Sequence, residues 1–294
     1  MMQDFKVPLD FQPFLAPAKI NLFLHITGQR ADGYHTLQSV FQLLDFYDTI
    51  HLKPTQTGEI KRVNDIANVP ASDDLCVRAA LALQQVTGCK QGADIAVEKR
   101  IPMGGGLGGG SSDAATVLIA LNHLWKLHLS REALMQIGLK IGADVPVFIF
   151  GQTAWAEGIG ELLTAIKLAP QVLNQHYMVL TPQVHVSTAQ VFANSALTKD
   201  TKPLKIADFS RSANSSIFKN DLEAVVCTEF PAVAATLEWL NQFGQARMSG
   251  SGASVFVAVN SKQVANELLA KKPTITTGFV AKGIVKHPHF DLTK

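Results

Sequence analysis

The most informative group of residues for chemistry is a glycine cluster in the first half of the chain. Six glycines fall within positions 104–110, and Ser111 and Ser112 follow directly before a helical pattern. Glycine permits positive φ angles and lets backbone N–H groups approach a ligand without side-chain obstruction. The free N–H groups and the dipole at the start of a helix attract anions. Serine hydroxyls cap helices or donate to phosphate oxygens. We therefore predict a phosphate-binding loop here.

The motifs of three common nucleotide-binding folds match this cluster poorly. Gly104, Gly106 and Gly109 have the G-x-G-x-x-G spacing, but a dinucleotide site also needs an acidic residue after the next strand, ~20 residues on. The candidate, Glu132, lies in a helical pattern. The Gly-Lys-Ser/Thr of a P-loop and the protein-kinase motif set are both missing from the sequence. A flexible linker is disfavoured because the cluster lies between an apolar strand pattern and a helix.

Asp144 is the best candidate for a catalytic carboxylate. If the bound phosphate is a group to be transferred, the enzyme uses a carboxylate to orient or deprotonate the acceptor hydroxyl. Asp144 follows a helix stop at Gly142 and precedes Pro146, among apolar neighbours that predict a largely apolar setting. A turn or capping role is equally compatible with this position. Lys19 and Asn21 lie on the same side of a predicted strand, where an ordinary solvated lysine is the simpler interpretation.

The elements that carry these residues follow from hydrophobic periodicity. Alternation predicts a strand over 16–26, and further strand-like runs occur at 39–44, 49–52 and 95–101. Helical spacing is seen over 72–86, from 114 to 125, and over 130–141. In the second half we expect strands at 177–180, 184–186, 254–259 and 279–285, and helices at 188–196, 222–226, 232–243 and 263–270. Strands and helices mixed in this way predict an α+β fold.

Composition limits the class of protein. The 294 residues have 47% hydrophobic content, enough for a large core, and their length suggests two domains or one large one. With 26 basic and 24 acidic residues and a densest basic run of only Lys99-Arg100, the chain lacks the basic clusters that bind nucleic acid. No apolar run reaches the ~18 residues of a membrane span, and the N-terminus lacks the apolar core of a signal peptide. The three cysteines show no CxxC spacing, which favours a cytoplasmic protein.

Several segments together resemble one known family. The run Pro102-Met103-Gly104-Gly105-Gly106-Leu107-Gly108-Gly109-Gly110-Ser111-Ser112 is similar to the phosphate loop of the GHMP small-molecule kinases. Four further segments extend the resemblance over most of the chain and in the family's order. They are 16–22 (Ala-Pro-Ala-Lys-Ile-Asn-Leu), 30–35 (Arg-Ala-Asp-Gly-Tyr-His), 142–148 (Gly-Ala-Asp-Val-Pro-Val-Phe) and 248–253 (Met-Ser-Gly-Ser-Gly-Ala). The Asp-Gly-Tyr-His segment resembles a branch of the family that acts on a cytidine diphosphate-linked alcohol.

The resemblance implies roles for particular residues. Asp144 matches the catalytic base, and Lys19 matches a lysine near the acceptor hydroxyl and that base. Tyr34 and His35 match the residues that stack on and hydrogen-bond to cytosine, and Asn21 reaches the same ligand. Thr188 and Phe192 match positions that close the cytidine pocket, although their helical spacing also suits core residues.

The implied ATP side includes Lys99 and Leu75 besides the glycine loop. Asp74 stands where the family more often has Asn, which argues against specific side-chain contacts to adenine. Gly250-Ser251-Gly252 matches the third family motif, which supports the site from the second domain.

By resemblance we expect two domains, residues 1–160 with a ribosomal-protein-like fold and residues 161–294 with a ferredoxin-like fold. The expected activity is ATP-dependent phosphorylation of the 2-hydroxyl of a cytidine diphosphate-linked methylerythritol in non-mevalonate isoprenoid biosynthesis. Mg²⁺ is implied by the chemistry, with no ligands identified. No nucleic acid or membrane partner is expected, and the chain is expected to be a monomer or weak homodimer. Another GHMP kinase, such as a homoserine or mevalonate kinase, is the nearest alternative. A nucleotide-sensing or dinucleotide-binding protein without kinase activity is a different one.

Overall fold

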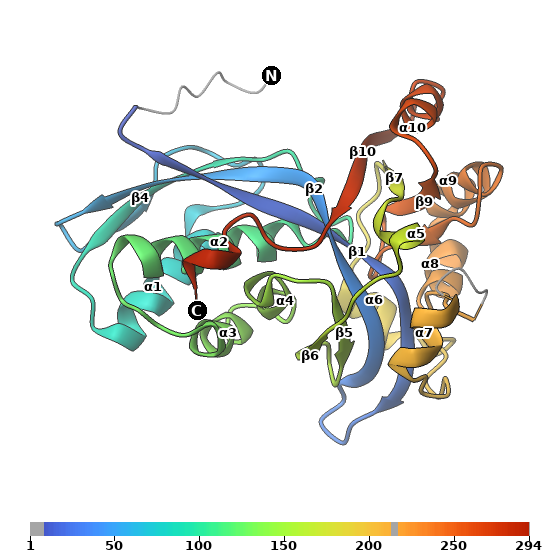
Figure 1. Cartoon of the computed structure of the whole chain (residues 1–294), viewed down its shortest axis with the longest axis horizontal. Helices are drawn as coiled ribbons and strands as arrows, with labels where there is room; N and C mark the ends of the chain where they lie inside the picture. Colours follow the sequence, from blue (N-terminus) through green and yellow to red (C-terminus); the bar gives the residue numbers. More distant parts are fainter. Residues whose placement is uncertain (1–8, 213–216, 294) are drawn as a thin grey trace.

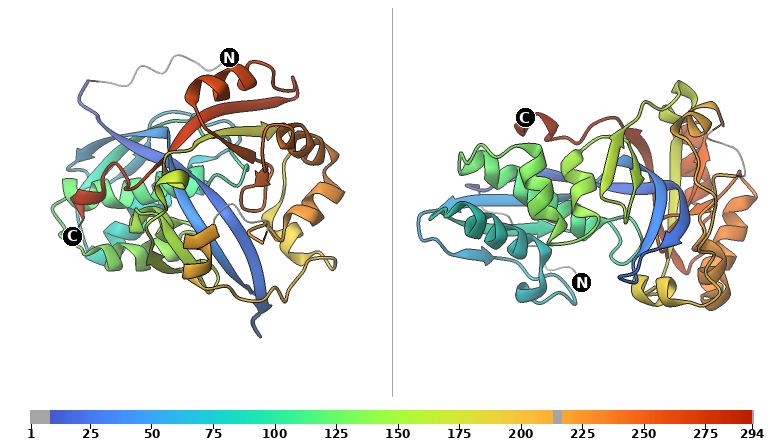
Figure 2. Two further views of the ribbon diagram at one scale, coloured as in Figure 1. Left: turned by 45° about the vertical axis from the view of Figure 1, so that its right-hand side comes forward. Right: turned by 90° about the horizontal axis from the view of Figure 1, so that it is seen from below.

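The fold was analysed in a computed structural model that describes residues 9–212 and 217–293. Its strands form one mixed sheet with the order β3-β4-β2-β10-β7-β9-β8, to which β1 and β5 are joined through β2, and β6 through β5. Most pairs of strands are antiparallel, and β3 and β4 are parallel. The sheet runs through both halves of the molecule. Figures 1 and 2 show that the molecule is elongated and that the helices of the two halves lie at opposite ends.

The first half contains two long paired strands and a group of helices that covers them. The strands are β1 (Gln12–Gln29), β2 (His35–Thr55), β3 (Ile60–Arg62), β4 (Gly92–Glu98), β5 (Ala154–Glu157) and β6 (Leu162–Ala165). The helices are α1 (Leu75–Thr87), α2 (Gly109–Leu124), α3 (Arg131–Leu139) and α4 (Val145–Phe150), with a 3-10 turn at Ala71–Asp73. Buried apolar side chains of α1, α2 and α4 pack on β2 and β4 in one core.

The second half places helices against the other end of the sheet. Its strands are β7 (His176–Pro182), β8 (Arg247–Met248), β9 (Val255–Val259) and β10 (Thr276–Ile284). Its helices are α5 (Pro170–Leu173), α6 (Thr188–Ala193), α7 (Ile206–Ser212), α8 (Glu223–Glu229), α9 (Pro231–Asn241) and α10 (Lys262–Leu269), and a 3-10 turn lies at Phe290–Leu292. Two apolar clusters occupy the two faces of β7 and β9.

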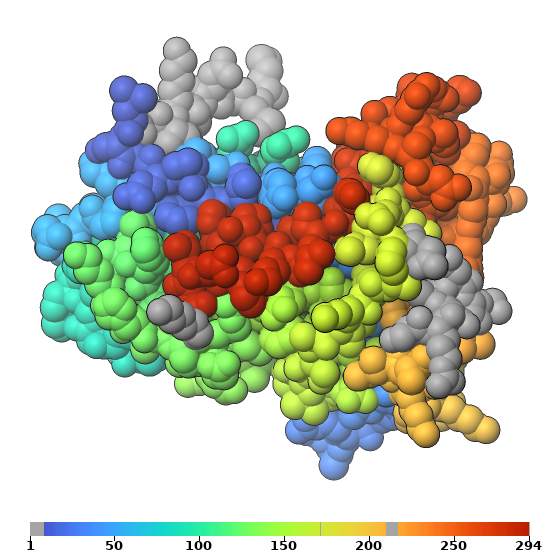
Figure 3. Space-filling model, viewed as in Figure 1, coloured from blue at the N-terminus to red at the C-terminus, as the bar shows by residue number. Residues whose placement is uncertain are grey.

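The last residues return to the first half. After β10 pairs with β2, the chain crosses α2 and α4, and His287 donates its backbone N–H to the Gly151 carbonyl at 2.8 Å. The Arg131 guanidinium donates to the carbonyls of Phe290 and Thr293. Figure 3 shows this segment in red, lying across the surface of the first half. The division into residues 1–160 and 161–294 stays a prediction.

The mixed α+β class and most of the expected elements are confirmed. Two expected strands, 39–44 and 49–52, are parts of the single strand β2, because the polar residues between them are held in the sheet by their own contacts. The expected strand at 184–186 is wrong. β7 ends at Pro182, where its pairing with β10 also stops, so residues 184–186 have no strand partner.

No helix within residues 9–212 and 217–293 combines the length and apolar character needed to cross a membrane.

Candidate active site

A cavity of about 760 Å³ lies where the two halves meet. The first half contributes β1, the glycine loop, the start of α2 and the turn before α4, and the second half contributes residues 185–188 and 250–252. Most of the predicted site residues line it, namely Lys19, Asn21, Leu75, Lys99, Pro102, Met103, Gly104, Gly105, Gly106, Gly108, Gly109, Gly110, Ser111, Asp144, Thr188 and Phe192. The cavity therefore gathers residues as far apart in the sequence as Lys19 and Gly252.

The glycine loop needs glycine for two separate reasons. Gly106 and Gly108 both have φ near +72°, in the left-handed region that side chains rarely adopt. A Cβ atom on Gly106 would lie 2.1 Å from the Ser249 carbonyl oxygen, so the loop also approaches the second half too closely for any side chain. Ser249 Oγ donates to the Gly106 carbonyl at 3.0 Å, and Ser254 N donates to the Gly105 carbonyl at 3.1 Å. The second half thus fixes the shape of the loop.

The start of α2 presents free backbone donors to the cavity. Gly108 is the N-cap, and the next three residues are in the first turn, where N–H groups have no partner within the helix. Gly109, Gly110 and Ser111 also line the cavity, so these N–H groups and the helix dipole favour a bound anion.

Of the two roles that the sequence left open for Ser111 and Ser112, capping of the helix is wrong. No side chain caps α2, because the left-handed turn at Gly108 starts the helix early and places Ser111 and Ser112 inside its first turn. Ser112 and Leu107 are fully buried and do not line the cavity, so any contribution of these two to nucleotide binding comes through packing.

Asp144 and Lys19 form an ion pair on the cavity wall. Asp144 Oδ2 lies 3.5 Å from Lys19 Nζ. The Lys19 side chain is only 3% exposed, whereas that of Asp144 is 41% exposed, so the expected apolar setting of Asp144 is wrong and its carboxylate faces the cavity. Lys19 Nζ also donates to Asn21 Oδ1 at 2.7 Å, and Asn21 Nδ2 donates to Ser39 Oγ at 2.8 Å. The ammonium is therefore held in place beside a carboxylate that a substrate can reach.

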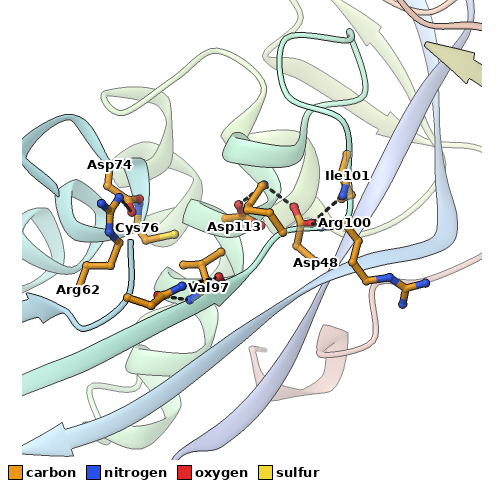
Figure 4. Close-up of polar contacts among 10 residues, drawn as sticks. Asp48, Arg62, Asp74, Cys76, Val97, Arg100, Ile101 and Asp113 are labelled. Atoms are coloured by element: carbon orange, nitrogen blue, oxygen red, sulfur yellow. Dashed lines mark hydrogen bonds and ion pairs between the residues drawn. The ribbon is translucent and has the colours of Figure 1, made fainter. Parts of the chain in front are cut away.

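A buried charge cluster lies beside the glycine loop. Sequence analysis did not identify two of its members, Asp48 and Asp113. Lys99 Nζ is paired with Asp48 and Asp113, and Asp48 Oδ1 accepts the backbone N–H groups of Arg100 and Ile101 at 2.5 and 2.8 Å (Figure 4). Burial lowers the pKa of Lys99, but the carboxylates of Asp113 and Asp48 outweigh burial, so its pKa is raised. Lys99 is thus a charged, doubly paired residue and not a solvated one.

Asp113 differs from its partner Asp48 because it also lines the cavity. Burial raises the pKa of Asp113, and the attraction of Lys99 only partly offsets this effect. Its Oδ1 atom is buried and has no hydrogen-bond partner in the part of the chain that the structure describes. The only sequence signal for Asp113 was its position directly after the two serines of the loop.

The segment expected at the adenine edge is built around Asp74. Its Oδ1 accepts the Cys76 N–H at 2.7 Å as the N-cap of α1, and its Oδ2 pairs with Arg62 Nη1 at 2.8 Å (Figure 4). Both carboxylate oxygens are therefore engaged within the protein, and the absence of specific contacts from Asp74 to adenine stays a prediction. Leu75 lines the cavity and offers an apolar surface to a purine ring.

The residues expected to bind a pyrimidine are only partly brought together. The rings of His35 and Phe192 are 5.5 Å apart and tilted by 34°. His35 Nε2 is buried, and it has no hydrogen-bond partner among residues 9–212 and 217–293. Thr188 Oγ1 lies 2.7 Å from Ser251 Oγ in the third motif. Tyr34 is 62% exposed and, like His35, does not line the cavity. Its ring lies at the turn between β1 and β2.

The third motif is held by a residue that sequence analysis missed. Asn220 Nδ2 donates to the carbonyls of Met248 and Gly250 at 2.9 and 2.7 Å. This amide fixes the turn that contacts the glycine loop. No short pattern in the sequence marks an asparagine 28 residues before its partner as important.

No group of three or more His, Cys, Asp or Glu side chains in the described part of the chain has the arrangement of a metal site. Mg²⁺ in nucleotide-dependent enzymes takes most of its ligands from phosphates and water, with one or two from the protein. The Ser111 hydroxyl and the unpartnered Oδ1 atom of Asp113 are suitable protein oxygens beside the loop.

Comparisons with known proteins agree with this geometry. The model of the GHMP kinases N terminal domain matches residues 74–152, which include the glycine loop and Asp144. The model of the GHMP kinases C terminal domain matches residues 194–271. These two matches define the class as GHMP kinases, which are small-molecule phosphotransferases.

Curated relatives narrow the class. One from Herminiimonas arsenicoxydans is 54% identical over 93% of this chain and 95% of its own length. One from Thiobacillus denitrificans is 53% identical over 95% of this chain and 98% of its own length. Both are named 4-diphosphocytidyl-2-C-methyl-D-erythritol kinase, and this chain belongs to that family of GHMP kinases.

Solved structures show the same fold. A crystal structure of 4-(cytidine 5'-diphospho)-2C-methyl-D-erythritol kinase has a TM-score of 0.77 and 30% identity, covering 93% of this chain and all of that one. The Methanococcus jannaschii mevalonate kinase has a TM-score of 0.68 at 16% identity, covering 95% of this chain and all of that one, which shows a shared fold alone.

Proposed function

We propose that this chain transfers the γ-phosphoryl group of ATP to the 2-hydroxyl of 4-diphosphocytidyl-2-C-methyl-D-erythritol. The product belongs to the non-mevalonate route to isoprenoid precursors. The observation that carries the proposal is the Lys19–Asp144 pair, 3.5 Å apart, on the wall of a cavity that also contains the glycine loop. The names of close relatives and of a structural neighbour support the same substrate.

In this proposal the loop and α2 hold the ATP phosphates. The N–H groups of Gly109, Gly110 and Ser111 donate to phosphate oxygens, since they have no partners within the helix. Lys99 sets the position of the loop from below, and its charge lies near the helix start, 3.3 Å from where a Cβ of Gly109 would be. Leu75 packs on the adenine ring.

Asp144 accepts the proton of the acceptor hydroxyl in our proposal. The cavity-facing carboxylate is the suitable base, and Lys19 beside it stabilises the charge that develops on the transferring group. Asn21 holds Lys19 in this position and can contact the same substrate. The chemistry needs in-line positioning and charge neutralisation more than covalent participation by the protein.

The cytosine ring is proposed to lie between the His35–Phe192 pair and the Tyr34 ring. His35 Nε2 is buried and unpartnered, which makes it available to the polar edge of a base. Tyr34 is exposed and would have to turn toward the cavity when substrate binds. Thr188 would contact the same substrate through the hydroxyl that faces Ser251.

Mg²⁺ is part of the proposal, held by the ATP phosphates together with Ser111 and Asp113. When bound, it neutralises charge on the β- and γ-phosphates. ADP release should then require added Mg²⁺ and stop when EDTA is in excess. Full activity in excess EDTA would contradict this role.

We also propose a cytoplasmic enzyme that acts as a monomer or weak homodimer on small molecules and not on nucleic acid or membranes. The three cysteines are free thiols, which fits a reducing compartment. The net charge of +2 gives no general affinity for polyanions. Sedimentation velocity at several protein concentrations tests the oligomeric state, and a stable tetramer would contradict it.

The function is tested by ADP release with a panel of four acceptors. These are the cytidine-linked substrate, mevalonate, homoserine and galactose. We expect turnover with the first acceptor and values of kcat/KM at least ~10³-fold lower with the others, because only the first can use the His35–Phe192 pair. Preferential turnover of one of the other three would overturn the assignment.

A further inference from the structure

A second cavity of about 320 Å³ lies in the second half of the molecule, and none of its lining residues lines the active-site cavity. It occupies the face of β7 and β9 opposite to the packed side of α9 and α10, so that β1, α5 and α7 border it. Its apolar wall consists of Leu22, Val172, Phe209 and Phe256. The size is at the lower end for cavities that bind small ligands.

The polar part of this cavity is dominated by Arg247. The residue is only 9% exposed. Its Nη1 atom donates to the Leu22 carbonyl at 3.2 Å, and its Nη2 atom donates to Gln245 Oε1 at 2.9 Å. Its Nε atom is buried and has no hydrogen-bond partner. Arg247 therefore lines the cavity with a guanidinium whose donors are not all used within the described residues.

Among the described residues, the charge of Arg247 also lacks a close ion-pair partner. Within residues 9–212 and 217–293, no carboxylate forms an ion pair with it. Glu223 is the acidic group that acts on it most strongly, yet Glu223 Oε2 is engaged by the Met248 N–H at 2.8 Å. A buried cation without a paired anion is unfavourable, and an arginine edge is well suited to a carboxylate or phosphate.

The rim of the cavity supplies further polar groups. Gln245 is exposed and Gln175 is half-buried, so both can contact a charged head group that enters toward Arg247. The aromatic and aliphatic wall beyond them suits a short apolar body. The two parts of the cavity together select an amphipathic anion over a bare inorganic one.

We propose that this cavity binds a small organic anion, with its carboxylate or phosphate on Arg247 and its apolar body against Phe209 and Phe256, and that occupancy is transmitted to the active site. The binding part does not depend on the proposed function. The transmission part rests on it, because its measure is the kinase activity.

The route of transmission consists of contacts on both sides of Arg247. The Leu22 carbonyl that accepts from Arg247 follows Asn21 directly in β1, and Asn21 holds Lys19. Ser249, two residues after Arg247, accepts the Asn21 N–H at 3.3 Å and donates to the glycine loop. A ligand that binds to Arg247 and shifts its side chain therefore acts on two parts of the active site, the Lys19–Asn21 pair and the glycine loop.

Binding is tested by isothermal titration calorimetry of the full chain with four probes. They are n-butyl phosphate, pentanoate, inorganic phosphate and 1-butanol, each with and without saturating ADP to block the nucleotide site. We expect one saturable site for butyl phosphate or pentanoate that ADP does not abolish, and at least ~10-fold weaker binding of the other two probes. Whichever of butyl phosphate and pentanoate binds more tightly identifies the head group as a phosphate or a carboxylate. No saturable binding, or complete displacement by ADP, would overturn the proposal.

Variants locate the site. Ala258 lines the cavity opposite Tyr177 in the strand register, so Ala258→Phe should fill the space without removing Arg247. Ala224→Phe is the matched control, because Ala224 is exposed on α8 and does not line the cavity. We expect Ala258→Phe and Arg247→Gln to weaken the affinity for the probe at least ~10-fold, and Ala224→Phe to leave that affinity unchanged. If Arg247→Gln does not fold, Ala258→Phe decides, and unchanged affinity in that variant contradicts the site.

Transmission is measured as kcat/KM for the cytidine-linked substrate with and without saturating probe. The expected result is at least a ~2-fold change in the wild-type chain and in Ala224→Phe, with no change in Ala258→Phe. Saturable binding without any change in kcat/KM would overturn the transmission. Failure of the chain to phosphorylate this substrate at all would instead refute the proposed function, and the calorimetric result would stand by itself.

Discussion

Replacing Asp144 with asparagine tests the catalytic arrangement because it preserves the side-chain shape and removes one charge. The lost interaction is the 3.5 Å pair with Lys19. The side chain of Asp144 is 41% exposed and makes no capping hydrogen bond to α4, although Asp144 is the N-cap residue, and Lys19 keeps its hydrogen bond to Asn21. We therefore expect the free energy of unfolding to fall by no more than about 1 kcal/mol.

The effect on turnover should be much larger. A positioned base contributes ~10²–10⁴-fold, which corresponds to about 3–5 kcal/mol in the activation free energy. The loss should appear in kcat, with KM for ATP within a few-fold of wild type, because Asp144 is not among the residues that hold the phosphates in our proposal.

The assay is steady-state ADP release at saturating substrates, together with a thermal melt of each variant. Asp200→Asn is the matched control, because Asp200 is exposed and does not line the cavity, and it should behave as wild type. A folded Asp144→Asn variant that keeps kcat within ~3-fold of wild type would refute the role of Asp144 as base. An equal loss of kcat in Asp200→Asn would show that the effect is not specific to Asp144.

Three further predictions concern other parts of the site and the fold. Lys99→Met leaves Asp48 and Asp113 buried without a cation, so the free energy of unfolding should drop by about 3–5 kcal/mol in urea titrations; an unchanged midpoint would contradict the pairing. Phe192→Ala removes the partner ring of the pyrimidine pocket and should raise KM for the cytidine-linked substrate ~5–100-fold while KM for ATP stays constant; equal changes in both KM values would contradict a pyrimidine-specific role. His287 is buried in the C-terminal segment, and burial lowers its pKa to about 3, so the folded state disfavours protonation. Stability should be full above pH 6.5 and decline as the pH falls toward 3, by about 2–3 kcal/mol at pH 4.5; denaturation curves of His287→Asn should lack this component, and identical pH profiles would refute it.

Local patterns predicted much of the first half. The helix α1 ends where Gly88 adopts φ +68°, and α3 begins where Ser130 accepts the Ala133 N–H, and both signals are visible in the sequence. The alternation in β1 placed Lys19 and Asn21 on one side, and their side chains are hydrogen-bonded at 2.7 Å. Such features depend on neighbours within a few residues, which a sequence displays directly.

Contacts between distant segments could not be predicted in this way. The polar side of β1 is buried and not solvated, because the turn containing Ser249 covers it from 228 residues away. Asp48 lies 51 residues before Lys99, and it can pair with Lys99 and accept the Ile101 N–H only because β2 lies next to the segment before the glycine loop. The strand β2 is continuous through this polar stretch only because its carboxylate finds those partners.

The central claim is that the chain transfers phosphate to a cytidine-linked alcohol. The most direct measurement is a ³¹P NMR time course of the wild-type chain with ATP, Mg²⁺ and 4-diphosphocytidyl-2-C-methyl-D-erythritol. We predict one new phosphomonoester resonance that grows in step with ADP while the diphosphate resonances of the substrate are retained. Growth of inorganic phosphate in step with ADP, with no new monoester, would contradict the claim.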